Sequence, residues 1–159
     1  MTVFNNNDEV QSFLTKFKVR FADIFLTDTS TTIYDETRHW LKNYSKAYEQ
    51  YNNAIMKIGN KIYNRNILDD LKLSLELLTR ELLNNEKSLE NNIDTIFKSL
   101  KDKDISTELR SMISTLIDYY SKYQNTYIKH NDNVKSHEIE FIFQLTSSIM
   151  QFLIKILGN

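Results

Sequence analysis

Glu36 and His39 are the first residues in the chain whose types and spacing could do chemistry. A carboxylate and an imidazole three residues apart lie on one face of a helix, and di-iron bundles use this spacing for metal ligands. Those sites need two such pairs and two further carboxylates. Because the chain offers one pair, we interpret Glu36 and His39 as part of a solvated helix start and expect no metal and no other cofactor.

Three tyrosines, Tyr44, Tyr48 and Tyr51, follow at alternating spacings of four and three. Aromatic side chains in a row can stack on the bases of a nucleic acid. The same spacing is typical of the apolar seam of a helix that packs against another helix. We favour packing.

The stretch from Tyr119 to His130 ends a predicted helix on a histidine beside a polar loop. An imidazole that titrates near neutral pH suits general acid–base catalysis. His130 also fits a plainer role, because an imidazolium at a helix C-terminus interacts favourably with the helix dipole. Both interpretations stay open. The chain has no glycine-rich phosphate loop, no G-x-S-x-G and no H-E-x-x-H.

Six helices are expected to position these residues, because apolar residues recur every three or four positions along most of the chain. The polar stretch Thr27–Thr32 is expected to be a loop, since its side chains compete with the helix for backbone hydrogen bonds. Ser106 is expected to cap the fifth helix. The first three expected helices cover about 8–25, 33–63 and 66–83. A short fourth helix carries Leu89, Ile93, Ile96, Phe97 and Leu100, a fifth carries Leu109 to Tyr127 and ends by the polar stretch at His130, and the last runs from Ser136 to Gly158.

The second of these helices is the longest and would reach about 45 Å at roughly 1.5 Å per residue. That is longer than a compact bundle of this size needs. We therefore expect it either to break near Gly59 and Asn60 or to protrude.

The composition agrees with a single all-α domain spanning residues 1–159. The chain has no proline and two glycines among 159 residues, which favours long helices. Its formal net charge of −1 indicates no general attraction to nucleic acid or anionic membranes. Without cysteine it forms no disulfide. The N-terminus resembles no signal peptide and no run of 18 apolar residues occurs, so we expect a cytoplasmic protein without a membrane span.

The order of elements in the second half resembles the HEPN superfamily, especially the C-terminal domains of abortive-infection proteins. The resemblance rests on a leucine-rich helix, a short helix, a helix that ends on a polar pair with a histidine several residues later, a polar loop, and a last helix with Glu138-Ile-Glu140-Phe141. It covers residues 66–157 and implies a HEPN-like core of four to five helices, with 1–65 as an N-terminal helical extension.

In that family the motif is an arginine followed by a polar residue and then, four to six residues on, by a histidine. Two copies face each other in a dimer and cleave RNA without a metal. The resemblance implies that His130 is the histidine and Asn125 the polar residue, while Gln124 stands where the arginine belongs. Glutamine cannot supply the charge of a guanidinium, and removing such a group commonly costs about a hundredfold in rate. Lys122 and Lys129 could replace that charge, and His137 has a weaker claim than His130.

Two hypotheses follow. The first is a HEPN-like homodimer of a bacterial or phage defence or toxin–antitoxin system, which binds RNA or a protein partner and has lost or weakened ribonuclease activity. In a surviving ribonuclease, His130 would be the acid or base, with Asn125 orienting the phosphate. The second is a non-enzymatic interaction protein, such as an antitoxin, an immunity protein or a phage inhibitor, that grips its partner with the long tyrosine-bearing helix.

Overall fold

The computed structural model describes residues 28–62, 65–127 and 135–159, and within them it is all-α, with no strand. Six α-helices and one short 3-10 helix follow one another within these described residues. Their bounds are α2 Asp28–Leu41, α3 Ser45–Gly59, α4 Arg65–Leu83, η1 Glu90–Asn92, α5 Ile93–Lys101, α6 Thr107–Tyr127 and α7 Ser136–Leu157.

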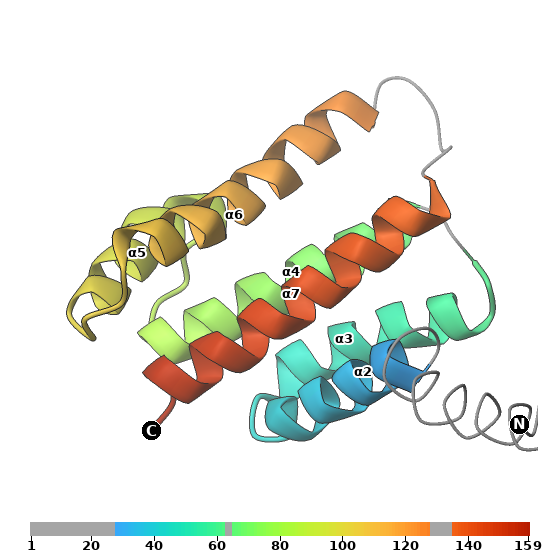
Figure 1. Cartoon of the computed structure of the whole chain (residues 1–159), viewed down its shortest axis with the longest axis horizontal. Coiled ribbons are helices and arrows are strands. Elements are labelled where there is room, and N and C mark those ends of the chain that lie inside the picture. The colour runs from blue at the N-terminus through green and yellow to red at the C-terminus, as the bar shows by residue number, and fades with distance from the viewer. Residues whose placement is uncertain (1–27, 63–64, 128–134) are drawn as a thin grey trace, which may run out of the picture.

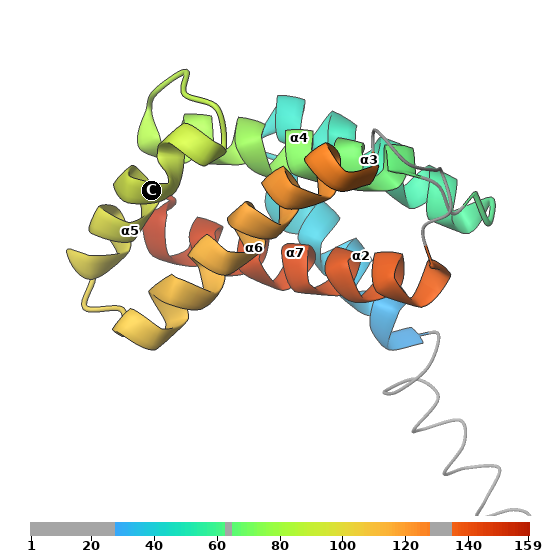
Figure 2. The ribbon, with the colours of Figure 1, turned by 90° about the horizontal axis from the view of Figure 1, so that it is seen from above.

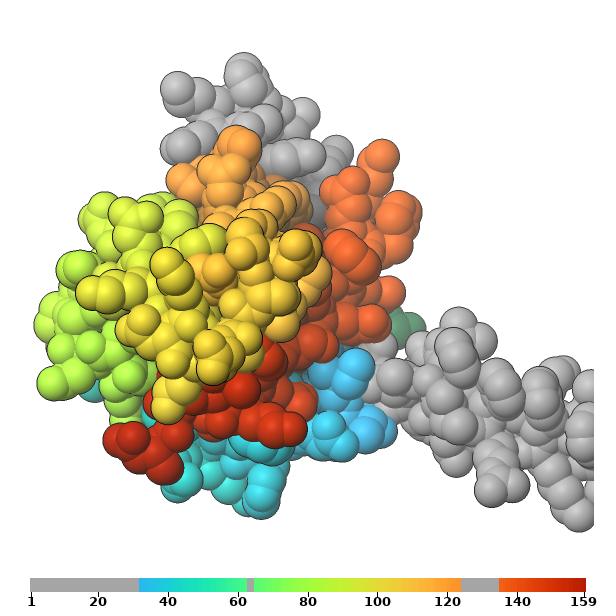
Figure 3. All heavy atoms as spheres, turned by 60° about the vertical axis from the view of Figure 1, so that its left-hand side comes forward, coloured from blue at the N-terminus to red at the C-terminus, as the bar shows by residue number. Residues whose placement is uncertain are grey.

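Four of these helices close a ring of contacts in the order α2, α3, α4, α7 and back to α2, which makes a four-helix bundle. Figure 1 shows α2 beside α3 in the lower layer and α4 beside α7 in the middle. The α5–α6 hairpin lies above that middle layer, as the view from above in Figure 2 also shows. In Figure 3 the hairpin, yellow to orange, lies against the ends of α4 and α7.

The expected long helix over 33–63 is wrong, because the chain turns back between Leu41 and Ser45. A single helix of that length would carry half of its apolar seam beyond the bundle, whose longest helix, α7, has 22 residues. Folding the seam into a hairpin places Leu41, Ala47 and Tyr51 in one core, each fully buried. The second part of the expectation is confirmed, since α3 ends at Gly59.

The expected loop over Thr27–Thr32 is also wrong, because α2 begins at Asp28. Aspartate, serine and threonine are well tolerated where a helix starts, since the first N–H groups lack partners within the helix. Burial of Tyr34 and Thr37 one and two turns later then holds this helix against α7.

Of the remaining described elements, α4, α6 and α7 follow the sequence pattern closely, whereas the short helix expected to carry Leu89 begins at Ile93, after η1. The helix expected over 66–83 is α4, and Ser106 accepts a hydrogen bond from the backbone N–H of Leu109 at 3.3 Å, as a capping residue does. The helix expected over 8–25 lies outside the described residues. The structure also describes six α-helices, but they are not the six that were expected. The expected long helix is divided into α2 and α3, and the first expected helix is not among the described ones.

Helices from both sides of the expected boundary at residue 65 share one hydrophobic core. On α3, Ala47 and Ala54 are small and fully buried, so α4 approaches closely, and Ser74 Oγ donates to the carbonyl of Ala47 at 2.7 Å. An ion pair of 2.5 Å between Lys57 and Asp70 joins the same two helices. The division into a HEPN-like portion and an extension stays a prediction.

The helix α7 is the central element of the bundle, and its polar side chains bind its neighbours. Thr146 is hydrogen-bonded to Tyr120 of α6 at 2.5 Å and Ser147 to Tyr51 of α3 at 2.6 Å. Gln151 donates to Thr37 of α2 at 2.8 Å. By length and composition α7 could cross a membrane, yet half of its most apolar window is buried inside the protein. Core helices have the same character, and these side-chain bonds explain its polar positions as contacts within a bundle.

Candidate functional site between α6 and α7

An open groove of about 600 Å³ lies between the last turns of α6 and the first turns of α7. From α6 it is lined by Tyr119, Lys122 and Tyr123. From α7 it is lined by His137, Glu138, Phe141 and Ile142. We call this surface the α6–α7 groove.

Helical periodicity places these residues on facing walls. Tyr119 and Tyr123 are four residues apart on α6, so they share a face, and their ring centroids lie 5.8 Å from each other. Glu138 and Ile142 share a face of α7 for the same reason. The side-chain hydrogen bond between Tyr120 and Thr146 joins the two helices further along, and the lining residues of α7, 137–142, lie between Thr146 and the start of that helix.

The walls of the groove are mainly apolar, and two of their residues differ sharply in exposure. Ile142 is 7% exposed and belongs to the core, whereas Phe141 is 63% exposed and is the most exposed large apolar side chain in the described residues. Tyr123 is buried at 3%. An exposed phenylalanine beside a concave aromatic wall is typical of a binding surface.

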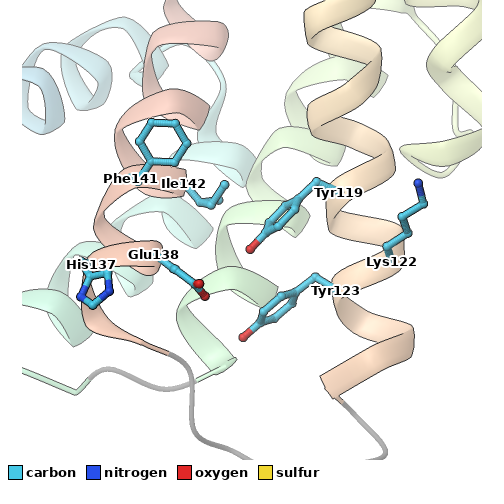
Figure 4. A pocket seen from close by; sticks show the side chains of 7 residues that line it. All are labelled: Tyr119, Lys122, Tyr123, His137, Glu138, Phe141 and Ile142. Carbon is cyan, nitrogen blue, oxygen red and sulfur yellow. The ribbon is translucent and has the colours of Figure 1, made fainter.

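The charged groups of the groove give it little attraction for phosphate. Figure 4 shows the carboxylate of Glu138 pointing across the groove towards the hydroxyl ends of Tyr119 and Tyr123. Lys122 points away from α7 in that view and forms an ion pair with Asp118 at 2.6 Å. The side chain that faces the space between the helices is therefore an acid, and the base is turned outwards.

Below the groove, Tyr120 is 1% exposed and its hydroxyl is shared with Thr146. Burial raises the pKa of this tyrosine above its usual value, although the hydrogen bond to Thr146 opposes the shift. The hydroxyl stays protonated at any physiological pH. Tyr120 is consequently a buried, hydrogen-bonded contact between α6 and α7.

The residues predicted from the motif lie at the edge of the described structure. Gln124 and Asn125 belong to the last turn of α6, directly after the groove tyrosine Tyr123, but their side chains lie outside the described residues, and so does the whole of His130. Whether these three groups come together is therefore still a prediction. The motif and the groove share one end of α6.

The tyrosines of the expected long helix do not form a surface of their own. Tyr51 is fully buried and bonded to Ser147, and Tyr44 and Tyr48 are half-buried against the core. The interpretation as packing is confirmed for Tyr51. The expected binding of a partner by one long tyrosine-bearing helix is not possible, because the residues of that helix form two separate helices, α2 and α3.

Glu36 and His39 lie exposed on α2. Within residues 28–62, 65–127 and 135–159 no three or more His, Asp or Glu side chains are grouped so that they could hold a metal ion. The sequence pattern indicated the stretch from Tyr119 to His130 and the run from Glu138 to Phe141, but it did not join them into one site. The helical spacing of both groups, on either side of one polar loop, is visible in the sequence. That α6 and α7 lie side by side to form a groove depends on the tertiary structure and cannot be predicted from this spacing.

A comparison of the chain with known protein families, with characterised proteins and with solved structures finds no match. The resemblance to the HEPN superfamily is thus neither supported nor contradicted by relatives.

Proposed function

We propose that this chain is a non-enzymatic interaction protein on a HEPN-like helical scaffold, and that it binds an apolar helical segment of a protein partner in the α6–α7 groove. The observation that carries the proposal is the exposed Phe141 beside the aromatic wall of Tyr119 and Tyr123. Large apolar side chains around a concave surface supply most of the binding free energy in protein interfaces.

A protein partner fits this surface better than RNA does. Nucleic acids are bound chiefly through lysine and arginine contacts to phosphates. The groove has one lysine, which is turned outwards, and a glutamate that faces inwards. The formal net charge of −1 adds no attraction from a distance. An antitoxin, an immunity protein or a phage inhibitor would need such a surface.

Photo-crosslinking tests the proposal. A photoreactive phenylalanine analogue placed at Phe141 of the full chain is expected to capture a protein in the native host, whereas the same analogue at Met112, which is 45% exposed on α6 outside the groove, is not. The captured protein is then purified and its dissociation constant is measured. We expect Phe141→Asp to weaken binding about tenfold or more, as the loss of a hot-spot residue does. Equal affinity of wild type and Phe141→Asp would rule out the groove as the binding site.

A second candidate function keeps the ribonuclease of the HEPN resemblance in weakened form. The observation in its favour is that His137 lines the groove at the end where α6 carries Gln124 and Asn125. Incubation of the purified chain with labelled single-stranded RNA separates the two proposals. We expect no cleavage by the wild type, and cleavage that disappears in His130→Ala or His137→Ala would overturn the non-enzymatic assignment.

Gln124→Arg is the sharper variant, because it restores the charge that the family motif has at this position. If the scaffold is a silenced HEPN enzyme, this variant gains ribonuclease activity and the double variant Gln124→Arg, His130→Ala loses it again. If Gln124→Arg has no activity, the resemblance is one of fold alone.

A further inference from the structure

We infer that the α6–α7 groove contains a site for one basic side chain, a lysine or an arginine that borders the apolar face of the partner's helix. The site is formed by the carboxylate of Glu138 and the aromatic rings of Tyr119 and Phe141. The inference rests on the proposed function, because it gives the chemistry of the segment that the same groove binds.

The carboxylate of Glu138 carries the only negative charge among the residues that line the groove, and it points towards the hydroxyl ends of Tyr119 and Tyr123 (Figure 4). Glu138 forms no ion pair within residues 28–62, 65–127 and 135–159. The lysine of the groove, Lys122, is paired with Asp118 and turned outwards. The described residues therefore leave this negative charge without a counter-charge.

The position of Glu138 in its helix explains its residue type but not its direction. Glu138 lies in the first turn of α7, where the helix dipole favours an anion. A carboxylate that pointed away from the groove would serve the dipole equally well. The neighbouring His137 lies on the side of α7 away from the two tyrosines in Figure 4. The direction of Glu138 is thus a property of the groove.

A wholly apolar partner would bind this groove poorly. Such a segment would cover the carboxylate of Glu138 and remove its water without offering a counter-charge, and burying an unpaired charge is costly. An acidic residue at the same place would be repelled. A basic residue offsets the lost hydration of Glu138, so the partner's helix needs one cation beside its apolar face.

The aromatic walls suit the same cation. An ammonium or guanidinium group is attracted to the face of an aromatic ring within about 6 Å of the ring centroid. Tyr119 is half-buried on one wall and Phe141 is exposed on the other. The methylene stem of a lysine or arginine packs on apolar surface, here Phe141 and Ile142, while its charge stays near water. An open groove allows this arrangement.

Three small probes test the site in the full chain: hexylammonium, hexanol and hexanoate, which share an alkyl stem and differ in charge. NMR titrations follow the ring signals of Tyr119 and Phe141. We expect hexylammonium to bind about two- to fivefold more tightly than hexanol, and hexanoate to bind most weakly. Added salt should weaken the binding of hexylammonium without weakening that of hexanol, because salt screens the charge of Glu138.

Glu138→Gln removes the charge and retains the shape of the side chain. It should abolish the preference for hexylammonium over hexanol, whereas Glu140→Gln, on the same helix but outside the lining residues, should retain it. Both positions are exposed, so both variants should unfold at the wild-type urea midpoint. The inference is overturned if hexylammonium gives no saturable shifts, if hexanol binds the wild type as tightly, or if the preference survives Glu138→Gln.

The partner captured through Phe141 gives a second test. Glu138→Lys should raise the dissociation constant about tenfold or more, and replacement of the partner's basic residue by glutamate should restore most of the affinity. A partner that binds wild type and Glu138→Lys equally removes this inference and leaves the proposed function intact. A preference for hexylammonium that depends on Glu138, in a chain whose Phe141 captures no protein, supports the cation site and removes the proposed function.

Discussion

At the residue scale, two buried tyrosine hydroxyls help to determine how the helices pack against α7. Tyr51 and Tyr120 are almost fully buried, and each shares a hydrogen bond with a hydroxyl on α7. A buried donor or acceptor without a partner costs about 1–3 kcal/mol, so these pairs fix which helix faces which. The tyrosines thus determine how α3 and α6 sit on α7.

The pKa of Tyr51 gives a prediction for alkaline pH. Burial raises the pKa of Tyr51 from 10.0 to about 12, in spite of the hydrogen bond to Ser147. Because the folded state holds the proton more tightly, stability is complete below pH 10 and falls as the pH rises towards 12. This one group should cost about 1.4 kcal/mol per pH unit in that window. Urea unfolding of wild type and Tyr51→Phe between pH 8 and 11.5 measures it, and the variant should show a shallower fall.

Tyr48→Phe is the control for this experiment. Tyr48 lies about one turn away on the same helix, but its pKa is lowered by hydrogen bonding to Asn52. Its removal should leave the steep alkaline fall in place. Parallel curves for the wild type and Tyr51→Phe would contradict the assignment.

At the scale of elements, local signals decide where helices start, and Ser106 is the clearest example. Its side chain accepts from Leu109 N–H at the beginning of α6, the helix that forms one wall of the groove. Ser106→Ala should lower the free energy of unfolding by about 0.5–2 kcal/mol, whereas Ser106→Asp should retain stability, since aspartate also caps. The midpoint of urea unfolding reports both, with Ser111→Ala on the exposed side of α6 as the neutral comparison. No loss in Ser106→Ala would mean that the cap is not formed.

Element boundaries that depend on packing behave differently. The break at Leu41–Ser45 has no proline and no glycine, and its local signals are only Asn43 and Ser45, which are common at helix ends but also occur within helices. The two halves of the apolar seam separate there because a bundle of this thickness can bury each half only if they run side by side. The seam was therefore predicted correctly as a packing surface and wrongly as one helix.

At the scale of the whole molecule, two adjacent groove residues of α7 have different roles: Phe141 is exposed to solvent, whereas Ile142 belongs to the core. Phe141→Asp should change the unfolding free energy by less than about 0.5 kcal/mol in dilute, monomeric protein, because that side chain is 63% exposed. Ile142→Asp should cost more than about 3 kcal/mol, because it removes a 7%-exposed core side chain and buries a charge. Circular dichroism during thermal unfolding distinguishes them, and a Phe141→Asp protein that fails to fold would place Phe141 in the core.

The sequence by itself determined the helical class, the cap at Ser106, the end of α3 at Gly59 and the apolar faces of most helices. These follow from interactions between residues at most four apart, which the order of residues specifies directly. Only the tertiary structure decided that α2 and α3 form a hairpin, that α7 is the centre of the bundle, and that Tyr119, Tyr123 and Phe141 line one groove. The reason is that each of these depends on how helices distant in sequence pair, and an amphipathic pattern states that a face must be buried without stating against what.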